Sequence, residues 1–278
     1  MSNILRQLGN FGVSHYLCPA DVPLLSFLDA TVAAGFSCVG LTERALHELP
    51  LPTINRELRV RELTVSSVNT AGYFLFEGKQ REDQERTNEF LLNAASELQA
   101  VNGVNLIVGG SHAITLKDAR ALAFQKSSEL AHRAQSLGTR LLLEPMHPIQ
   151  TSGKGCVNTL RQAEHWTESI AGLTLNLDLF HSWWDPDLAP TLEGIMAPIA
   201  VIQICDVSVS PETMMPARVP LGEGQIDWRS PVMHMISQDR SRPIEVELFA
   251  SQLPGRDCLE LLERTAEQLT ALFKGKDE

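Results

Sequence analysis

Eight short apolar segments recur along the whole chain, separated by longer stretches in which apolar residues follow helical spacing. The segments cover residues 11–14, 36–41, 63–68, 104–108, 140–144, 173–178, 201–205 and 244–247. Their length and hydrophobicity are typical of strands that are covered on both faces, as in a parallel sheet. The stretch with Leu24, Leu28 and Val32 shows the three- and four-residue spacing of the intervening helices. Strand and helix therefore alternate throughout.

This alternation predicts the fold class. Each strand–helix–strand unit makes two parallel neighbours, and eight strands are the number that closes a (β/α)₈ TIM barrel. An open, doubly wound sheet is the alternative. No Gly/Ser-rich or Pro-rich linker divides the 278 residues. We therefore expect residues 1–278 to form a single α/β barrel domain.

Composition narrows the range of partners. The formal net charge of −11 argues against nucleic acid, because a phosphate-backbone binder needs a basic stripe. Five cysteines are scattered without a CxxC pair, which indicates neither a disulfide framework nor a cysteine zinc site. The N-terminus lacks a long apolar signal region, and no apolar run approaches the roughly 20 residues that span a bilayer. We expect a cytoplasmic protein that binds small molecules and no membrane.

Polar side chains end the last four expected strands. They are Glu144, Asp178, Gln203 and Glu247. In a (β/α)₈ barrel the C-terminal strand ends share one mouth, where the active sites of this fold lie. A buried carboxylate is costly unless it is paired or binds a metal. Three carboxylates and an amide oxygen are hard donors, so we expect one divalent ion; Mn²⁺ or Mg²⁺ is favoured, and Co²⁺ or Zn²⁺ is tolerated.

Each of these residues also has an ordinary interpretation. Glu144 or Asp178 could pair with an arginine of the barrel, and Gln203 could be a satisfied core amide. Their recurrence in phase on successive strands favours a shared site. Glu245 lies two residues before Glu247 and so points to the same face of the strand. We expect Glu245 to lie deeper, in a structural role beside a buried basic side chain.

Three further residues are candidate substrate contacts. His181, in DLFHSWWDP, could orient substrate or carry a proton near neutral pH, although it could also be a loop histidine among aromatic residues. Arg218 could clamp a carboxylate, a phosphate or a sugar hydroxyl. For His147, in EPMHP, a substrate contact and an ordinary loop role are both open. His15 and Asn69 are weaker candidates of the same kind.

An ordered set of motifs in the C-terminal half resembles the xylose isomerase-like superfamily of sugar phosphate isomerases and epimerases. The set comprises LEP at Glu144, DLFH from Asp178, QICD from Gln203, the loop PLGEGQIDW and VELF around Glu247. The resemblance implies a (β/α)₈ barrel, with Glu144, Asp178, Gln203 and Glu247 as metal ligands and His181 with Arg218 facing substrate. Many members have histidine where this chain has Gln203, and the glutamine should weaken zinc binding. Glutamine occurs at this position in some members, including dehydroshikimate dehydratases. The endonuclease branch needs a DxH pair that the loop VSVSPETMMPARVPLGEG lacks.

The resemblance and the strand-end residues together predict a metal-dependent isomerase or epimerase that works through a metal-stabilised enediolate. Its substrate would be a small sugar, a keto acid or a cyclic polyol ketone. Glu144 and Glu247, on opposite sides of the ion, would be the acid/base groups. The alternatives are a dehydratase of the 3-dehydroshikimate or inosose type and a sugar- or polyol-binding barrel without activity. Homo-oligomer formation is left open.

Overall fold

Eight parallel strands form a closed barrel in the computed structural model, which describes residues 4–98, 102–109, 114–151, 153–194, 198–212 and 214–273. The strands are β1 Phe11–Ser14, β2 Cys38–Thr42, β3 Thr64–Gly72, β4 Val104–Ile107, β5 Leu141–Leu143, β6 Leu173–Asp178, β7 Ile199–Ile204 and β10 Ile244–Val246. Around the barrel their order is β1-β10-β7-β6-β5-β4-β3-β2. This confirms the (β/α)₈ prediction, and the open sheet was the wrong alternative.

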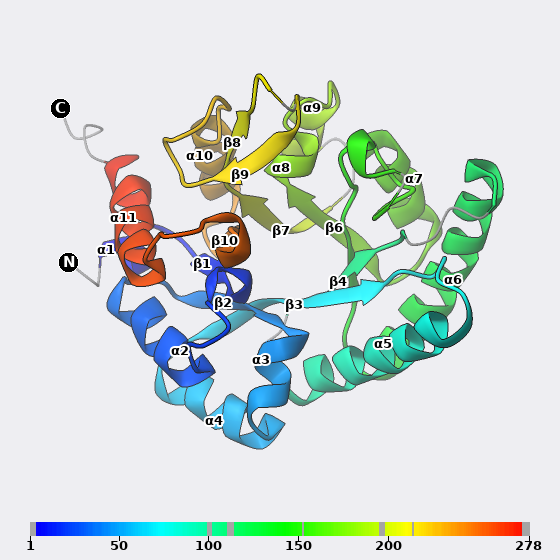
Figure 1. The fold of residues 1–278 in the computed structure, drawn as a ribbon, viewed down its shortest axis with the longest axis horizontal. Coiled ribbons are helices and arrows are strands. Elements are labelled where there is room, and N and C mark those ends of the chain that lie inside the picture. The colour runs from blue at the N-terminus through cyan, green and yellow to red at the C-terminus, as the bar shows by residue number, and fades with distance from the viewer. Residues whose placement is uncertain are drawn as a thin grey trace. The chain divides into compact units, whose positions relative to one another are not determined.

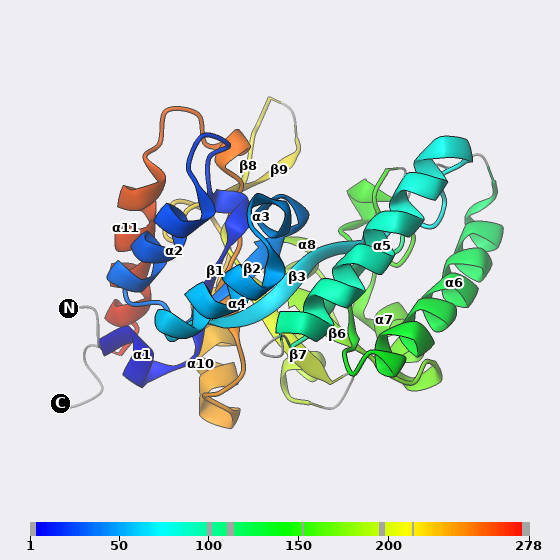
Figure 2. The ribbon, with the colours of Figure 1, turned by 90° about the horizontal axis from the view of Figure 1, so that it is seen from below.

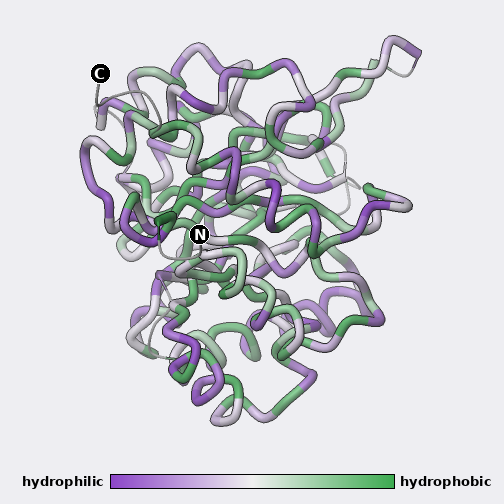
Figure 3. Tube along the Cα trace, turned by 90° about the vertical axis from the view of Figure 1, so that its left-hand side faces the viewer, coloured by the Kyte–Doolittle hydropathy of each residue, from purple (hydrophilic) through white to green (hydrophobic). Residues whose placement is uncertain are grey.

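Helices lie between the strands along the chain (Figure 1). They are α1 Ile4–Leu8, α2 Leu24–Ala33, α3 Glu43–Glu48, α4 Leu51–Val60, α5 Gly78–Leu98, α6 Leu116–Ser136, α7 Leu160–Ser169, α8 Leu179–Ser182, α9 Leu188–Leu192, α10 Arg229–Gln238 and α11 Cys258–Ala271. Short 3₁₀ turns are η1 His15–Leu17, η2 Pro148–Gln150 and η3 Ala250–Gln252. Hydrophobic and hydrophilic residues are interspersed along the helical segments (Figure 3). In α4, for example, Ile54 and Leu58 are buried one turn apart.

Several of the barrel strands are covered on both faces. Every residue of β1, β2, β4 and β5 is buried, as expected for a parallel barrel. The segment 11–14 has an additional requirement at Gly12, where a Cβ atom would collide with the Sγ atom of Cys38 on β2. A glycine is therefore needed for the close approach of these two strands.

The chain divides into two compact units. One comprises Met1–Ser66 with Gln203–Glu278, and the other comprises Ser67–Ile202. In the first unit α11 packs against α1 and α2, and in the second α5 and α6 lie side by side (Figure 2). The single-domain extent of the chain stays a prediction. Among the described residues, no helix is both long and apolar enough to cross a membrane.

A two-stranded antiparallel ribbon follows β7, which the sequence did not predict. It consists of β8 Asp206–Val209 and β9 Pro216–Val219, with Val207 opposite Arg218. The carboxylate of Asp206 accepts the backbone N–H groups of Gly222 at 3.1 Å and Ile226 at 3.2 Å. The loop PLGEGQIDW is thus folded around Asp206, and the ribbon fixes the position of Arg218.

Candidate metal and substrate site

Three buried side chains meet at the C-terminal ends of β5 and β6. Glu144 directly follows β5, Asp178 ends β6, and His181 lies in α8. Their exposed fractions are 3%, 1% and 6%. One ligand atom from each lies within 4.8 Å of the other two. We call these residues the Glu144 cluster; the sequence placed all three at the barrel mouth, and the structure brings them together.

Glu144 is held by two asparagines that the sequence analysis missed. Its Oε2 atom accepts hydrogen bonds from the side-chain amides of Asn105 on β4 and Asn176 on β6, the latter at 3.2 Å. Asn105 also donates to Asn69 at 3.0 Å, so Asn69 belongs to this buried amide network. Asn176 precedes Asp178 by two residues and shares its strand face. That spacing was the available signal, but a single asparagine does not reveal its partner.

Asp178 has its two carboxylate oxygens on different partners. Oδ1 accepts the backbone N–H of Phe180 at 2.9 Å and so caps α8. Oδ2 lies 3.7 Å from Nε2 of His181. The cap fixes the rotamer of Asp178, because the carboxylate must face the first turn of the helix. The remaining oxygen is thereby directed into the Glu144 cluster.

His181 is oriented by the backbone of the loop after β5. Its Nδ1 atom accepts the backbone N–H of His147 at 3.1 Å, so in the neutral ring the proton is on Nε2. Nε2 lies 3.5 Å from Oε1 of Glu144. A nitrogen that carries a proton is a hydrogen-bond donor and does not ligate a cation. This tautomer suits the substrate-facing role predicted for His181.

The ring of His147 contacts the backbone of its own loop and the side chain of Trp184. Its Nδ1 atom accepts the backbone N–H of Ile149 at 3.2 Å and caps η2. The ring also packs edge-on against Trp184, with 5.6 Å between ring centroids. Burial lowers the pKa of this imidazole below its ordinary value. The described contacts are those of a loop residue, and the substrate contact of His147 stays a prediction.

Arg218 pairs with a predicted catalytic residue. Its Nη2 atom lies 2.8 Å from Oε2 of Glu247, with both side chains buried. The guanidinium also lies over the ring of Phe249, 5.3 Å from the centroid, and Nη1 donates to Sγ of Cys205 at 3.6 Å. Arg218 is thus anchored on three sides, and its predicted contact with substrate stays a prediction.

Gln203 lies between two glutamates. Its Nε2 atom donates to Oε1 of Glu245 at 2.9 Å and to Oε1 of Glu247 at 3.1 Å. Glu245 is fully buried and also accepts the hydroxyl of Ser66. These two donors to Glu245 are neutral, and the basic side chain expected beside Glu245 stays a prediction. We call Gln203, Arg218, Glu245 and Glu247 the Gln203 cluster.

The sequence of the chain matches a known family over most of its length. Residues 28–272 match the family model described as xylose isomerase-like TIM barrel. This chain belongs to that family. The family membership predicted from the C-terminal motifs is therefore confirmed. No curated protein matches the chain in sequence.

Solved structures show the same fold as this xylose isomerase-like barrel. Protein SMc04130 from Sinorhizobium meliloti 1021 is 24% identical with a TM-score of 0.85, and the match covers 96% of this chain and 99% of that one. The probable 3-DHS dehydratase AsbF from Bacillus anthracis is 16% identical with a TM-score of 0.73, over 94% and 98% of the two chains. The 3-keto-D-glucoside 4-epimerase YcjR from E. coli is 15% identical with a TM-score of 0.73, over 95% and 99%. Likeness at these identities establishes the fold alone.

The donor chemistry of the Glu144 cluster in this family member fits a divalent ion. Oxygen ligands lie about 2.0–2.6 Å from Mg²⁺ or Ca²⁺, so two ligands of one ion are separated by at most about 5 Å. The carboxylate oxygens of Glu144 and Asp178 lie within 4.8 Å. Both are hard donors, and both are withdrawn from water. The identity of the ion stays a prediction.

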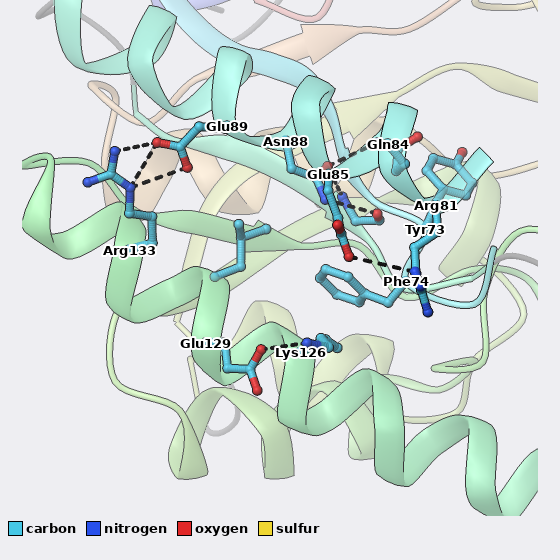
Figure 4. A pocket seen from close by; sticks show the side chains of 12 residues that line it. Tyr73, Phe74, Arg81, Gln84, Glu85, Asn88, Glu89, Lys126, Glu129 and Arg133 are labelled. Carbon is cyan, nitrogen blue, oxygen red and sulfur yellow. Dashed lines mark hydrogen bonds and ion pairs between the residues drawn. The ribbon is translucent and has the colours of Figure 1, made fainter. Parts of the chain in front are cut away.

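A separate hollow lies between α5 and α6 of this xylose isomerase-like barrel (Figure 4). Its volume is about 260 Å³, and Tyr73, Phe74 and Leu130 are among its lining residues. Its charged groups pair across or along the helices: Arg133 with Glu89, Lys126 with Glu129, and Arg81 with Glu85. No member of the Glu144 cluster lines it. These exposed ion pairs are typical of a solvated helix surface.

Proposed function

We propose that this chain is a divalent-metal-dependent isomerase or epimerase of a small ketose or cyclic polyol ketone. The observation that carries the proposal is the Glu144 cluster, in which two buried carboxylates and an imidazole lie together. Membership of the family supports it. So does the likeness to an epimerase fold, as an analogy only.

Glu144 and Asp178 would supply two oxygen ligands. We assign the remaining ligands to Gln203 and Glu247, because their amide and carboxylate oxygens are hard donors and because the motifs around them resemble those of the family. Mn²⁺ or Mg²⁺ is the favoured ion. When bound, such an ion would polarise a substrate carbonyl and its neighbouring hydroxyl, and so acidify the C–H bond between them.

Proton transfer is assigned to Glu144 and Glu247. In an epimerase one carboxylate removes the proton from one face of the carbon and the other returns a proton to the opposite face. In an isomerase the proton is returned to the neighbouring carbon. The Nε2–H group of His181, held in this tautomer by the backbone of His147, would donate to a substrate oxygen.

The partners of Arg218 bear on the substrate class. A clamp for a carboxylate or phosphate needs a guanidinium whose paired N–H groups face the ligand. Arg218 instead directs Nη2 to Glu247 and Nη1 to Cys205. We therefore favour an uncharged ketose or cyclic polyol ketone over a keto acid.

Solvent hydrogen exchange tests this function. The protein with Mg²⁺ would be incubated in D₂O with ketoses, cyclic polyol ketones and 3-dehydroshikimate. The molecular mass of each recovered compound would then be measured by mass spectrometry. We expect deuterium in at least one uncharged ketone, loss of that exchange in Glu247→Gln, and retention in the exposed control Glu267→Gln. Loss of water from dehydroshikimate would instead establish the dehydratase. If the protein catalyses neither exchange nor dehydration and gains no thermal stability from divalent ions, the alternative of a sugar- or polyol-binding barrel without activity is favoured.

A further inference from the structure

The two oxygens of the Glu144 carboxylate face different neighbours. Oε2 accepts hydrogen bonds from the side-chain amides of Asn105 on β4 and Asn176 on β6. Oε1 lies 3.5 Å from Nε2 of His181, and that nitrogen lies 3.7 Å from Oδ2 of Asp178. A carboxylate oxygen has two lone-pair sites, so two amide donors occupy both sites of Oε2. Oε1 is the oxygen that faces the Glu144 cluster.

The two amides come from the barrel strands on either side of Glu144. Glu144 follows β5, whose last residue pairs with Leu106 on β4 and with Leu175 on β6. Asn105 directly precedes Leu106, Asn176 directly follows Leu175, and both asparagines are buried. The backbone N–H group of Glu144 donates to the carbonyl of Leu106 at 3.0 Å. Strand pairing therefore fixes the amides beside the carboxylate more precisely than a loop would.

A further acceptor fixes the orientation of each amide. An asparagine that turned over would direct its carbonyl oxygen at Glu144, and the two oxygens would repel. Nδ2 of Asn105 also donates to Oδ1 of Asn69 at 3.0 Å, and Nδ2 of Asn176 also donates to Oδ1 of Asn105 at 3.1 Å. Nδ2 of Asn69 in turn donates to Oγ of Ser67 at 2.8 Å. These bonds present the nitrogen ends of two amides to Glu144.

An occupied Oε2 restricts how Glu144 can bind a cation. Ca²⁺ takes about six to eight oxygen ligands and readily uses both oxygens of one carboxylate, whereas Mg²⁺ demands a small, nearly octahedral set. For Oε2 to join Oε1 on one ion, it would have to release hydrogen bonds from two buried amides. Leaving buried donors unsatisfied is costly. Ca²⁺ is thereby denied a binding mode that Mg²⁺ does not need.

We propose that Asn105 and Asn176 form a clamp on Oε2 that limits Glu144 to ligation through one oxygen and so favours Mg²⁺ over Ca²⁺. This inference rests on the proposed metal site and adds the basis of its ion selectivity. The clamp lies in the compact unit Ser67–Ile202, which also contains Glu144 and Asp178. Outer partners of metal ligands typically contribute about 10- to 100-fold to metal affinity.

Paired calorimetric titrations with Mg²⁺ and Ca²⁺ on the full-length, metal-stripped protein test the clamp. Leucine has nearly the size of asparagine and no side-chain N–H group, so the double variant Asn105→Leu with Asn176→Leu frees Oε2. We expect Mg²⁺ affinity to fall about 10- to 100-fold. Ca²⁺ affinity should fall less, because Ca²⁺ can use the freed oxygen, and the preference for Mg²⁺ should shrink. Each single variant leaves one donor on Oε2 and should shift the preference in the same direction by less.

Asn88→Leu is the matched control. Asn88 is a buried asparagine of α5 whose amide bonds to the backbone N–H and carbonyl groups of Gly72. Its loss should lower stability and leave the preference between the two ions unchanged.

The ratio of the two affinities separates a clamp from a merely structural role. Equal losses of Mg²⁺ and Ca²⁺ affinity in the clamp variants, unchanged affinities, or a native preference for Ca²⁺ would overturn the proposal. If the double variant fails to fold, the single variants decide by the same ratio. A native protein that binds neither ion would overturn the metal site itself, and the clamp with it.

Discussion

Nη2 of Arg218 lies 2.8 Å from Oε2 of Glu247, and less than a tenth of either residue is exposed to solvent. Arg218 lies on the ribbon strand β9, and Glu247 directly follows β10. Phe249, two residues after Glu247, covers the other side of the guanidinium. The pair thus joins the loop that follows β7 to a residue assigned to catalysis.

Loss of the arginine should destabilise the protein. Arg218→Met leaves a buried carboxylate without its partner, which typically costs about 3–5 kcal/mol. Urea unfolding of the metal-free protein would measure the loss. The double variant Arg218→Met with Glu247→Gln removes both charges and should recover most of the stability. A loss below about 1 kcal/mol in the single variant, the value of an exposed pair, would contradict a buried ion pair.

The backbone of His147, and not its ring, should determine the tautomer of His181. His147 has a φ of −48°, close to the value of proline, so His147→Pro removes the N–H group with little backbone change. Nitrogen-15 NMR of the imidazole should show a proton on Nε2 in the native protein and in His147→Ala. In His147→Pro this preference should weaken. An unchanged tautomer in His147→Pro would show that another contact orients His181.

Stability should depend on the titration of His15. This ring is fully buried, with Nδ1 2.8 Å from Oγ1 of Thr42 and an edge-on contact with Phe27. Burial, aided by the positive charge of Arg44, lowers its pKa from 6.5 to about 3. The unfolded chain takes up the proton below about pH 6.5 and the folded protein only below about pH 3, so stability is lost as pH falls through this window.

At about pH 4.5 the loss from His15 is about 2–3 kcal/mol relative to about pH 7. The variant His15→Gln keeps a polar group near Thr42 and has no proton to take up. Urea unfolding at both pH values should therefore show a smaller decrease in the variant. Equal decreases in stability in the two proteins would show that the titration of His15 does not cause the loss of stability at low pH.

The strands were predictable because parallel barrel strands are buried on both faces. All eight expected segments coincide with or overlap a strand of the barrel. Even the glycine-containing segment 11–14 is β1, and Gly12 has a steric reason to be there. The ribbon of β8 and β9 was missed, since part of it lies in the polar segment between two candidate motifs.

The position of the candidate site was predictable from the sequence, but several hydrogen-bond and ion-pair partners of its residues were not. Strand ends located Glu144 and Asp178, because the fold gathers the C-terminal ends of its strands. The roles of Asn105 and Asn176 could not be inferred, since a polar residue in an apolar strand does not show which group it meets. The pairing of Arg218 with Glu247 was hidden for the same reason. Side-chain partners across strands are a property of register and packing.

Mn²⁺ titration of the metal-stripped protein, compared with Asp178→Asn, tests the proposed metal site most directly. Asp178→Asn keeps the size of the side chain and an oxygen that can cap α8, and it removes the charge assigned to the ion. Calorimetry should show one Mn²⁺ bound per native chain and greatly weakened binding in Asp178→Asn, with both proteins folded. Absence of Mn²⁺ binding by the native chain, or equal binding by the variant, would contradict a metal site at Glu144 and Asp178.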